Sequence, residues 1–482
     1  MDLKSSSLAL NTETFRPRLV HIWCVLAGLC LGAAAVISSE QFGLLAIPVV
    51  AFLVLVGPWL VREPFRLFLW LIVTWPLLTF YVHMDLPAGI PDILYERVIL
   101  LLLFAIVLIQ AFFFHLALPK VSAFVKVVLL VTLLGQLRIF VFGGMADFET
   151  SHIVGVLMPF AVYWLTKCFL VSQSRLRWLL ASLIAATLLI CLTGLVEQFL
   201  NAEVSFFSYG AIYEPVRRMM DVPGGRASGL MLNPAVFGAA VGLGILACIY
   251  FVTQTDDRPI RVLLVALIAL LAYGVFASYT RGAWLAVFAS LLFALYYMKS
   301  LRKPALLMAA CFSVVAFGFL YRDMQINEIL QSRIFETDNV AGRYNRIVFG
   351  WKCFLEKPIL GWGSGGYNAL IAGSREHGIG GFSASHNSFM NMLVDGGLVH
   401  VVSILALLLY WLSRAHTFAM RAPQTSMERC AVVAFASFIV IWSFTAMTIE
   451  LRYFAYFNSL LWIAGAAIEK LATNSTPATK HA

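Results

Sequence analysis

Charged residues are scarce in this chain of 482 residues. Asp, Glu, Lys and Arg together make up 12% of the sequence, about half of the roughly 25% that is usual in soluble globular domains. A soluble domain of ordinary composition is therefore excluded for most of the chain. Cysteine is also sparse, with eight residues and no C-x-x-C pair, which argues against a disulfide framework and against a cysteine-based zinc site.

Long apolar runs take the place of the missing polar residues. Hydrophobic residues make up 61% of the chain, and the mean hydropathy is +0.87. Runs of roughly 18–25 apolar residues match the length that a helix needs to cross about 30 Å of hydrocarbon. We therefore predict an all-α fold, a single integral membrane domain over residues 1–482 in the form of a polytopic helical bundle with about 14 transmembrane helices (range 12–14). The expected spans are 20–38, 42–61, 66–83, 97–115, 121–142, 153–171, 176–199, 229–253, 261–279, 282–298, 304–321, 387–412, 430–447 and 453–469.

Lys and Arg fall mainly on alternate connections of this predicted bundle. If the N-terminus is cytoplasmic, the short outside connections 84–96, 143–152 and 448–452 carry Arg452 as their single basic residue, in agreement with the positive-inside rule. This orientation predicts two periplasmic loops, 200–228 and a long one at 322–386 that contains short helices, and a disordered cytoplasmic tail at 470–482. The net charge of +9 fits this orientation and anionic lipid headgroups better than nucleic acid.

Two arginines stand at the outside ends of predicted helices. Arg226 follows two glycines at the end of the first outside loop and precedes a helix start, a position that suits an anionic ligand or, alternatively, a lipid phosphate. Arg281 is the single charge in a tight turn between two apolar spans. An ionisable residue there is costly and is a functional candidate, and a guanidinium matches a phosphate or diphosphate. The alternative for Arg281 is that it snorkels to lipid headgroups.

The long outside loop contains a helical pattern of apolar residues. They recur at helical spacing as Ile347, Trp351, Phe354 and Leu355. The pattern predicts an amphipathic helix on the outer membrane face that ends at Pro358. We place Arg343 and Arg346 in its first turn, where cations are unfavourable unless an anion is shared with the free backbone N–H groups. That placement weakly favours an anion site.

The segment Gly361–Gly366 spells G-x-G-x-x-G. A dinucleotide-binding fingerprint needs a preceding strand and a parallel sheet, and neither is predicted here. We interpret the segment as a glycine-rich turn that lets the backbone approach another backbone or a ligand closely.

His386 and Asn387 open the next apolar run. His386 titrates near neutral pH and suits proton transfer. Asn387 begins a polar stripe that continues at every fourth residue with Asn391 and Asp395. The alternative is that Ser385 or Asn387 simply caps the helix.

Asp395 is a carboxylate predicted to lie about two turns inside this helix. A buried carboxylate needs a partner or water. We interpret Asp395 as structural rather than catalytic, with Arg138 or Glu197–Gln198 as its expected partners.

Four pieces of sequence, in this order, resemble the O-antigen ligase/polymerase family of bacterial envelope glycan enzymes. The pieces are Arg226-Ala227-Ser228-Gly229 with Asn233-Pro234, Thr280-Arg281-Gly282-Ala283, Gly342-Arg343 with Pro358 and Gly361-Trp362-Gly363, and His386-Asn387-Ser388-Phe389 with Gly396-Gly397-Leu398. The likeness covers about 190–400, and the His-Asn piece is the most specific of the four. One departure is His400, which stands where the family pattern has a further glycine, and we expect it to affect packing only.

The resemblance implies a membrane glycosyltransferase of cell-envelope polysaccharide biosynthesis in the bacterial inner membrane, with its active site facing the periplasm. It implies transfer of a glycan from undecaprenyl diphosphate to an acceptor without a metal or another cofactor. The residues that match the essential groups of the family, and that we assign to catalysis, are Arg281, Arg343 and His386. The residues that we assign to diphosphate or glycan binding are Arg226, Arg346 and Asn387. Expected partners are the undecaprenyl-diphosphate-linked oligosaccharide, an acceptor glycan or lipid A–core, membrane lipids and other polysaccharide assembly proteins, and no nucleic acid.

The residue types agree with this chemistry. Two arginines would stabilise the charge that develops on a diphosphate leaving group, and His386 would accept the proton of the acceptor hydroxyl or orient it for in-line attack with inversion. The outside loops contain no D-x-D motif and no His/Asp cluster suited to a metal.

The sequence leaves the acceptor open. We slightly favour a polymerase, which extends exopolysaccharide or O-antigen, over an O-antigen ligase, and a protein O-glycosyltransferase is a third choice. The alternative from another class is a transporter or flippase of lipid-linked glycan, for which charges inside the membrane would mark a pathway. The polar residues concentrate at one face, however, and no inverted repeat is visible.

Overall fold

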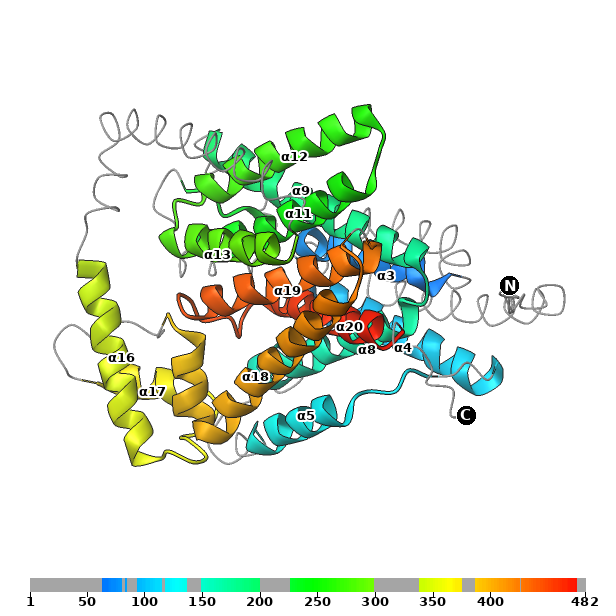
Figure 1. Ribbon diagram of the computed structural model, residues 1–482. Coiled ribbons are helices and arrows are strands. Elements are labelled where there is room, and N and C mark those ends of the chain that lie inside the picture. Colours follow the sequence, from blue (N-terminus) through cyan, green and yellow to red (C-terminus); the bar gives the residue numbers. More distant parts are fainter. Residues whose placement is uncertain are drawn as a thin grey trace, which may run out of the picture.

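The apolar runs of the sequence form helices that pack side by side in the computed structural model (Figure 1). The structure describes residues 63–79, 83–84, 93–114, 118–136, 149–199, 226–298, 338–374, 386–424 and 426–474. The helices are α3 (Pro64–Leu78), α4 (Tyr95–Phe114), α5 (Ala123–Gln136), η1 (Glu149–Leu157), α8 (Met158–Phe169), α9 (Gln173–Phe199), η3 (Gly229–Met231), α11 (Pro234–Gln254), α12 (Arg258–Ala277), α13 (Arg281–Tyr297), α16 (Asp338–Glu356), α17 (Gly366–Gly373), α18 (Ser388–Arg421), α19 (Met427–Ala446) and α20 (Ala455–Asn474). Within these ranges the strands are β1 (His83–Met84) and β2 (Ile93–Leu94), which pair antiparallel.

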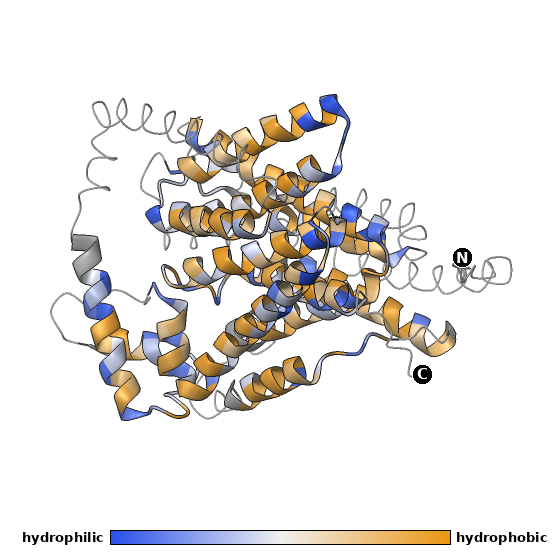
Figure 2. Cartoon of the chain, in the orientation of Figure 1, coloured by the Kyte–Doolittle hydropathy of each residue, from blue (hydrophilic) through white to orange (hydrophobic). Residues whose placement is uncertain are grey.

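The predicted helical class is confirmed over the described part of the chain. By length and composition, six of its helices could cross a membrane, namely α4, α9, α11, α12, α18 and α19. Figure 2 shows that hydrophobic residues cover most of the bundle, while hydrophilic residues gather toward helix ends and on α16. The count of about 14 spans stays a prediction, because the expected spans 20–38, 42–61 and 304–321 lie outside the described residues. So do residues 200–225, 322–337 and 375–385 of the two loops and residues 475–482 of the tail.

Contacts between helix termini define two opposite ends of the bundle. At one end, a Cβ on Gly282 would lie 2.9 Å from Thr448, so the start of α13 touches the connection between α19 and α20. At the other end of the same helices, the Tyr297 hydroxyl lies 2.7 Å from His416 Nδ1, and Arg429 donates to the Tyr297 carbonyl at 2.8 Å. We call the first of these the site end. Figure 1 shows α16 and α17 there, with α16 running across the direction of α13 and α19.

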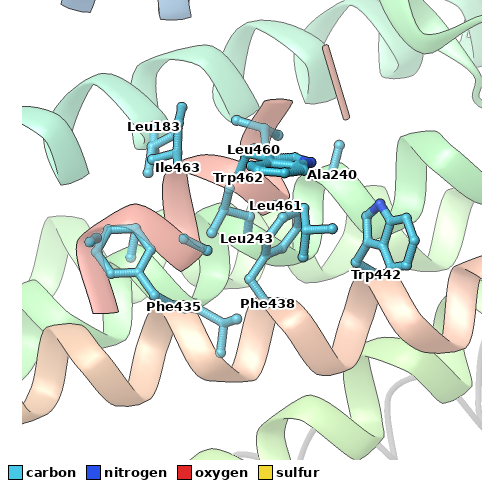
Figure 3. Close-up of a cluster of buried hydrophobic side chains, with 14 of the residues drawn as sticks. Leu183, Ala240, Leu243, Phe435, Phe438, Trp442, Leu460, Leu461, Trp462 and Ile463 are labelled. Atoms are coloured by element: carbon cyan, nitrogen blue, oxygen red, sulfur yellow. The ribbon is translucent and has the colours of Figure 1, made fainter. Parts of the chain in front are cut away.

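The core of the bundle forms around α11, α19 and α20. Large aromatic side chains from α19 and α20 interdigitate with smaller residues of α11, as Figure 3 shows for Phe435, Phe438, Trp462 and Leu243. Gly238 of α11 faces α13 closely, since a Cβ there would lie 2.8 Å from Ala283. Small residues at helix contacts are how membrane helices gain close packing without a hydrophobic driving force between them.

A buried ion pair joins α8 to α20 in the interior. Lys167 Nζ lies 2.9 Å from Glu469 Oε2, and both side chains are buried. The carboxylate also accepts hydrogen bonds from the Tyr163 hydroxyl at 2.8 Å and from Trp411 Nε1 at 3.0 Å. The negative charge is therefore stabilised by three side chains from two helices, Lys167 and Tyr163 of α8 and Trp411 of α18.

Replacing Lys167 with Met should destabilise the fold strongly. The substitution leaves the Glu469 carboxylate buried without its counter-charge, which typically costs about 3–5 kcal/mol. The measurement is the midpoint of thermal unfolding of the purified protein. The control is Asp256→Asn, which removes an ion pair to Arg261 from a fully exposed side chain and should cost little. Equal midpoints for the two variants would show that the buried pair does not stabilise the fold.

Candidate functional site

The start of α18 is fixed by its own cap and by the neighbouring connection. Asn387 Oδ1 accepts a hydrogen bond from the Met390 N–H at 3.0 Å, so Asn387 is the N-cap and that alternative for it is confirmed. Ser388 Oγ donates to the Ile449 carbonyl at 2.7 Å and accepts from the Leu451 N–H at 2.8 Å. Because the first turn of α18 is held on two sides, the residue before it has a defined position.

His386 is that residue. Its φ is +54°, in the left-handed region that non-glycine residues seldom adopt and that is over-represented at functional sites. Its side chain is half-buried. His386 therefore lies just before the first turn of α18, at the site end of the bundle.

Arg226 supports the turn that presents Arg281. Its Nη2 donates to Thr280 Oγ1 at 2.6 Å, and its Nε donates to the Ser278 carbonyl at 3.3 Å. Tyr279, between these two contacts, has a φ of +44°. Arg281 then begins α13, so the structure places Arg226 and Arg281 on the two sides of one turn.

Arg343 and Arg346 do not lie in the first turn of α16, and that prediction was wrong. The helix already begins at Asp338, since Asp338 and Asn339 favour helix starts, and this puts both arginines at least one turn further along. The argument from free N–H groups therefore does not apply to them. Arg346 is 7% exposed, and its carbonyl accepts a hydrogen bond from the Tyr367 hydroxyl at 2.5 Å.

Helix α18 is interrupted at Gly397, which has non-helical dihedral angles. The break removes the two hydrogen bonds that the N–H groups of Leu398 and Val399 would make to the carbonyls four residues earlier. The turn after α16 replaces both. The N–H groups of Leu398 and Val399 donate to the Pro358 and Ile359 carbonyls at 2.8 and 3.3 Å, and the Val394 and Asp395 carbonyls accept from the Trp362 and Gly363 N–H groups, each at 2.8 Å. We call these four bonds the α18 staple.

Backbone conformation and close contacts explain why glycine occupies positions 361 and 397 at the α18 staple. Gly361 and Gly397 have φ values of +64° and +65°. A Cβ on Gly361 would lie 2.5 Å from the Asp395 carbonyl, and one on Gly397 would lie 2.3 Å from the Ile359 oxygen. The interpretation of Gly361–Gly366 as a turn that lets two backbones approach closely is thus confirmed.

Asp395 joins the staple to α17 and to the connection between α19 and α20. Its Oδ1 accepts from the Tyr367 N–H at 2.8 Å and its Oδ2 from the Gly365 N–H at 3.1 Å. Arg452 Nη1 lies 3.2 Å from Asp395 Oδ2. The carboxylate therefore caps α17, which agrees with a structural role.

Of the expected partners of Asp395, Glu197 was wrong, and Arg138 stays a prediction. Glu197 is bonded elsewhere, to the N–H groups of Ser228 and Gly229 at 3.1 and 2.8 Å, and Arg138 lies outside the described residues. Arg452, which we did not predict as a partner, pairs with Asp395. The sequence could have indicated Arg452, because Arg452 is the single basic residue in the short outside connections.

A second, small hydrophobic cluster completes the attachment of the α16–α17 segment to α18. Its members are Cys353, Phe354, Tyr367, Ile371 and Val394. Trp362 lies beside it, with its Nε1 donating to the Cys353 carbonyl at 2.8 Å and the Lys357 ammonium 3.7 Å from its ring centroid. The segment that carries Arg343 and Arg346 is therefore held on α18 by backbone bonds, a helix cap and apolar packing together.

Three arginines and His386 share one electrostatic environment. Burial, followed by the positive charges of Arg346 and Arg343, lowers the pKa of His386 to about 4. Partial burial, followed by the charges of Arg346 and Arg281, lowers the pKa of Arg343. The structure thus places Arg343 and Arg346 of α16 near His386 and places Arg281, the first residue of α13, near Arg343, with Arg226 behind the Arg281 turn.

This arrangement can bind an anion beside a neutral base. At pH 7 a histidine with a pKa of about 4 is uncharged and can accept a proton. Clustered guanidiniums suit phosphate groups. Among the residues that the structure describes, no group of His, Cys, Asp or Glu is arranged to hold a metal ion.

Comparison with known families identifies the central part of the chain. Residues 265–404 match the family model described as O-antigen ligase, so the resemblance to the O-antigen ligase/polymerase family is confirmed. The matched segment contains Arg281, Arg343, Arg346, His386 and Asn387, and it ends within α18, before Arg452. No curated protein gives a significant match to the chain.

Proposed function

We propose that this chain, whose residues 265–404 are similar to O-antigen ligase, transfers a glycan from undecaprenyl diphosphate to an acceptor glycan at the periplasmic face of the bacterial inner membrane. The family match supports a membrane glycan-processing enzyme. The observation that carries the more specific proposal is the proximity of Arg343 and Arg346 to an uncharged His386, with Arg281 next to Arg343.

The arginines act on the leaving group in this proposal. A lipid diphosphate carries its charge at the level of the membrane surface, and more negative charge develops on it as the bond from the anomeric carbon to oxygen breaks. Preorganised guanidiniums stabilise such charge most effectively because they need no reorganisation during the reaction. Arg281 and Arg343 are assigned to this task, and Arg346 and Arg226 to holding the diphosphate and the Arg281 turn.

His386 acts on the nucleophile. Its free nitrogen takes the proton of the acceptor hydroxyl while that oxygen attacks the anomeric carbon from the side opposite the diphosphate, so the configuration inverts. Asn387 positions it through the helix cap. Burial and the positive charges of Arg346 and Arg343 keep His386 deprotonated. The same charges attract the anionic donor.

The test uses purified protein in lipid nanodiscs with a lipid-linked oligosaccharide as donor. Lengthening of the lipid-linked glycan indicates a polymerase, which we slightly favour, and transfer to lipid A–core indicates a ligase. No transfer to any acceptor, together with movement of the donor across a liposome membrane, would replace this proposal with a flippase.

The acid limb of the pH profile should lie well below the ordinary histidine range. His386 must be neutral to act as a base, and its pKa is lowered to about 4. The neutral form therefore persists to lower pH than in a free histidine of pKa about 6.5. Because kcat/KM reports the free enzyme, kcat/KM should stay level from pH 7 to about 5 and fall only toward pH 4.

Binding of the donor diphosphate should move the acid limb of the pH profile to higher pH. Its negative charge offsets the arginines and raises the pKa of His386, so the limb in kcat should lie at higher pH than the limb in kcat/KM. Arg343→Gln removes one of the charges that lower the pKa of His386 and should raise the kcat/KM limb. A wild-type kcat/KM limb near pH 6.5 would contradict the proposed environment of His386.

A further inference from the structure

A cavity of about 130 Å³ lies next to the candidate site, between α5, η1, α18, α19 and α20. Its lining includes Ser388, the second residue after His386, and Ser364 from the turn before α17. It also includes Trp442, whose ring lies 6.3 Å from that of Phe389, and Leu407 and Leu408 further along α18. The cavity thus begins at the level of the candidate base and extends into the bundle.

Three polar side chains of this cavity have unused hydrogen-bonding groups. Asn391 is 4% exposed and lies beside the Glu450 carboxylate, but neither its oxygen nor its nitrogen makes a hydrogen bond of good geometry in the described part of the chain. Glu450 is equally buried, and its Oε2 also lacks a partner there, although Arg452 pairs with its other oxygen. Arg452 Nη2 is the third such group. Buried polar atoms are nearly always bonded, so a cluster of exceptions around one cavity indicates a guest molecule.

The unused groups define the chemistry of that guest. Asn391 Oδ1 and Glu450 Oε2 need donors, whereas Asn391 Nδ2 and Arg452 Nη2 need acceptors. A hydroxyl group is both donor and acceptor, so a neutral guest with several hydroxyls satisfies all four atoms. An anion would meet Glu450 and Asp395, and a lipid chain would leave each polar atom unsatisfied at a cost of about 1–3 kcal/mol.

The walls of the cavity suit a ring. Its volume of about 130 Å³ is close to the roughly 150 Å³ of a cavity that holds benzene. Trp442 is fixed by a hydrogen bond from its Nε1 to Asn458 Oδ1 at 3.1 Å, and Trp462 packs edge-on against Trp411. Figure 3 shows both Trp442 and Trp462 within the buried cluster. Rigid aromatic walls with a few placed polar groups are typical of ligand pockets.

We propose that this cavity is a subsite for one neutral sugar ring of the acceptor glycan, held by Asn391, Glu450 and Arg452 between Trp442 and Trp462. The subsite rests on the proposed function, because it places the acceptor beside His386. It is separate from the arginines that we assign to the donor diphosphate.

The test measures sugar binding without turnover. Saturation-transfer NMR is recorded on the full chain in nanodiscs with methyl pyranosides of glucose, galactose, mannose, rhamnose and N-acetylglucosamine. At least one glycoside should bind the wild type, and Asn391→Leu should weaken it about tenfold or more, since two hydrogen bonds are lost. Glu450→Gln keeps the side-chain volume and should weaken binding as well, which guards against a packing effect of leucine at position 391.

The matched control is Thr132→Val on the same cavity. The Thr132 hydroxyl already bonds to the Val128 carbonyl at 2.8 Å, so binding should be unchanged. If no glycoside binds the wild type, or if Asn391→Leu and Thr132→Val bind equally, the cavity holds only water and the subsite is wrong.

Turnover then separates the two proposals. If the wild type transfers glycan but Asn391→Leu leaves the KM for the acceptor unchanged, the subsite fails and the proposed function stands. If glycosides bind through Asn391 but no glycan is transferred, the proposed function fails and a sugar-binding cavity remains.

Discussion

His386→Ala should reduce glycan transfer by about 10²–10⁴-fold while the protein stays folded in the membrane. The substitution removes the proton acceptor, and the Asn387 cap and the Ser388 bonds keep α18 in place. Arg281→Ala and Arg343→Ala should each cost about 10²–10³-fold in kcat, because each removes a charge aimed at the leaving group. The measurement is the initial rate of transfer by purified variants of equal thermal stability.

Two further variants sharpen this result. His416→Ala removes a histidine that bonds to Tyr297 at the opposite end of the bundle, and it should transfer glycan normally. Arg343→Lys keeps the charge but loses the planar, two-pronged donor, so it should recover only part of the rate. Transfer at the wild-type rate by His386→Ala or by Arg281→Ala would contradict the proposed mechanism.

Much of the helical arrangement follows from the sequence because membrane burial leaves few choices for the backbone. The predicted span 430–447 corresponds to α19 at Met427–Ala446, and 176–199 corresponds to α9 at Gln173–Phe199. The span expected at 387–412 instead continues as α18 to Arg421. There the polar residues beyond Leu412 extend the helix past the apolar run, and a count of apolar residues does not detect them.

The break in α18 could not be predicted from its own sequence. Gly396-Gly397 within an apolar run is compatible with a continuous helix, since isolated glycines cost only about 1 kcal/mol each. The break is stable because the turn at Pro358–Gly363, far away in the sequence, supplies the missing hydrogen bonds. Hydrophobic periodicity contains no information about such a pairing.

The candidate site, too, could be predicted from the sequence only in part. The sequence places Arg281, Arg343 and His386 at helix ends or on an amphipathic helix, and their residue types indicate an anion beside a base. The pairing of Asp395 with Arg452 depends on how α18 meets the connection between α19 and α20. Nothing in the spacing of residues specifies that contact, and this is why Arg452 was missed and Glu197 was expected as a partner of Asp395.

Gly397→Ala should detach the α16–α17 segment from α18 and abolish most of the transfer activity. The added methyl group would lie 2.3 Å from the Ile359 oxygen at a φ of +65°, so both sterics and backbone conformation oppose it. Forming a regular helix at residue 397 relieves the strain but withdraws the groups that bond to Pro358–Gly363. Arg343 and Arg346 then lose their fixed position near His386, and we expect a loss of about 10²-fold in kcat/KM.

The structural readout of this prediction is the protease sensitivity of α16 and α17, which should rise in Gly397→Ala. Gly361→Ala should behave similarly, because its methyl group would lie 2.5 Å from the Asp395 carbonyl. The control is Gly373→Ala at the end of α17, where an added Cβ has no neighbour within 4 Å among the described residues, and both activity and protease resistance should be retained. If Gly397→Ala loses activity but α16 and α17 remain as resistant as in the control, the staple does not position the arginines. The effect would then lie in α18 itself, where the same glycine sets the direction of the helix that His386 precedes.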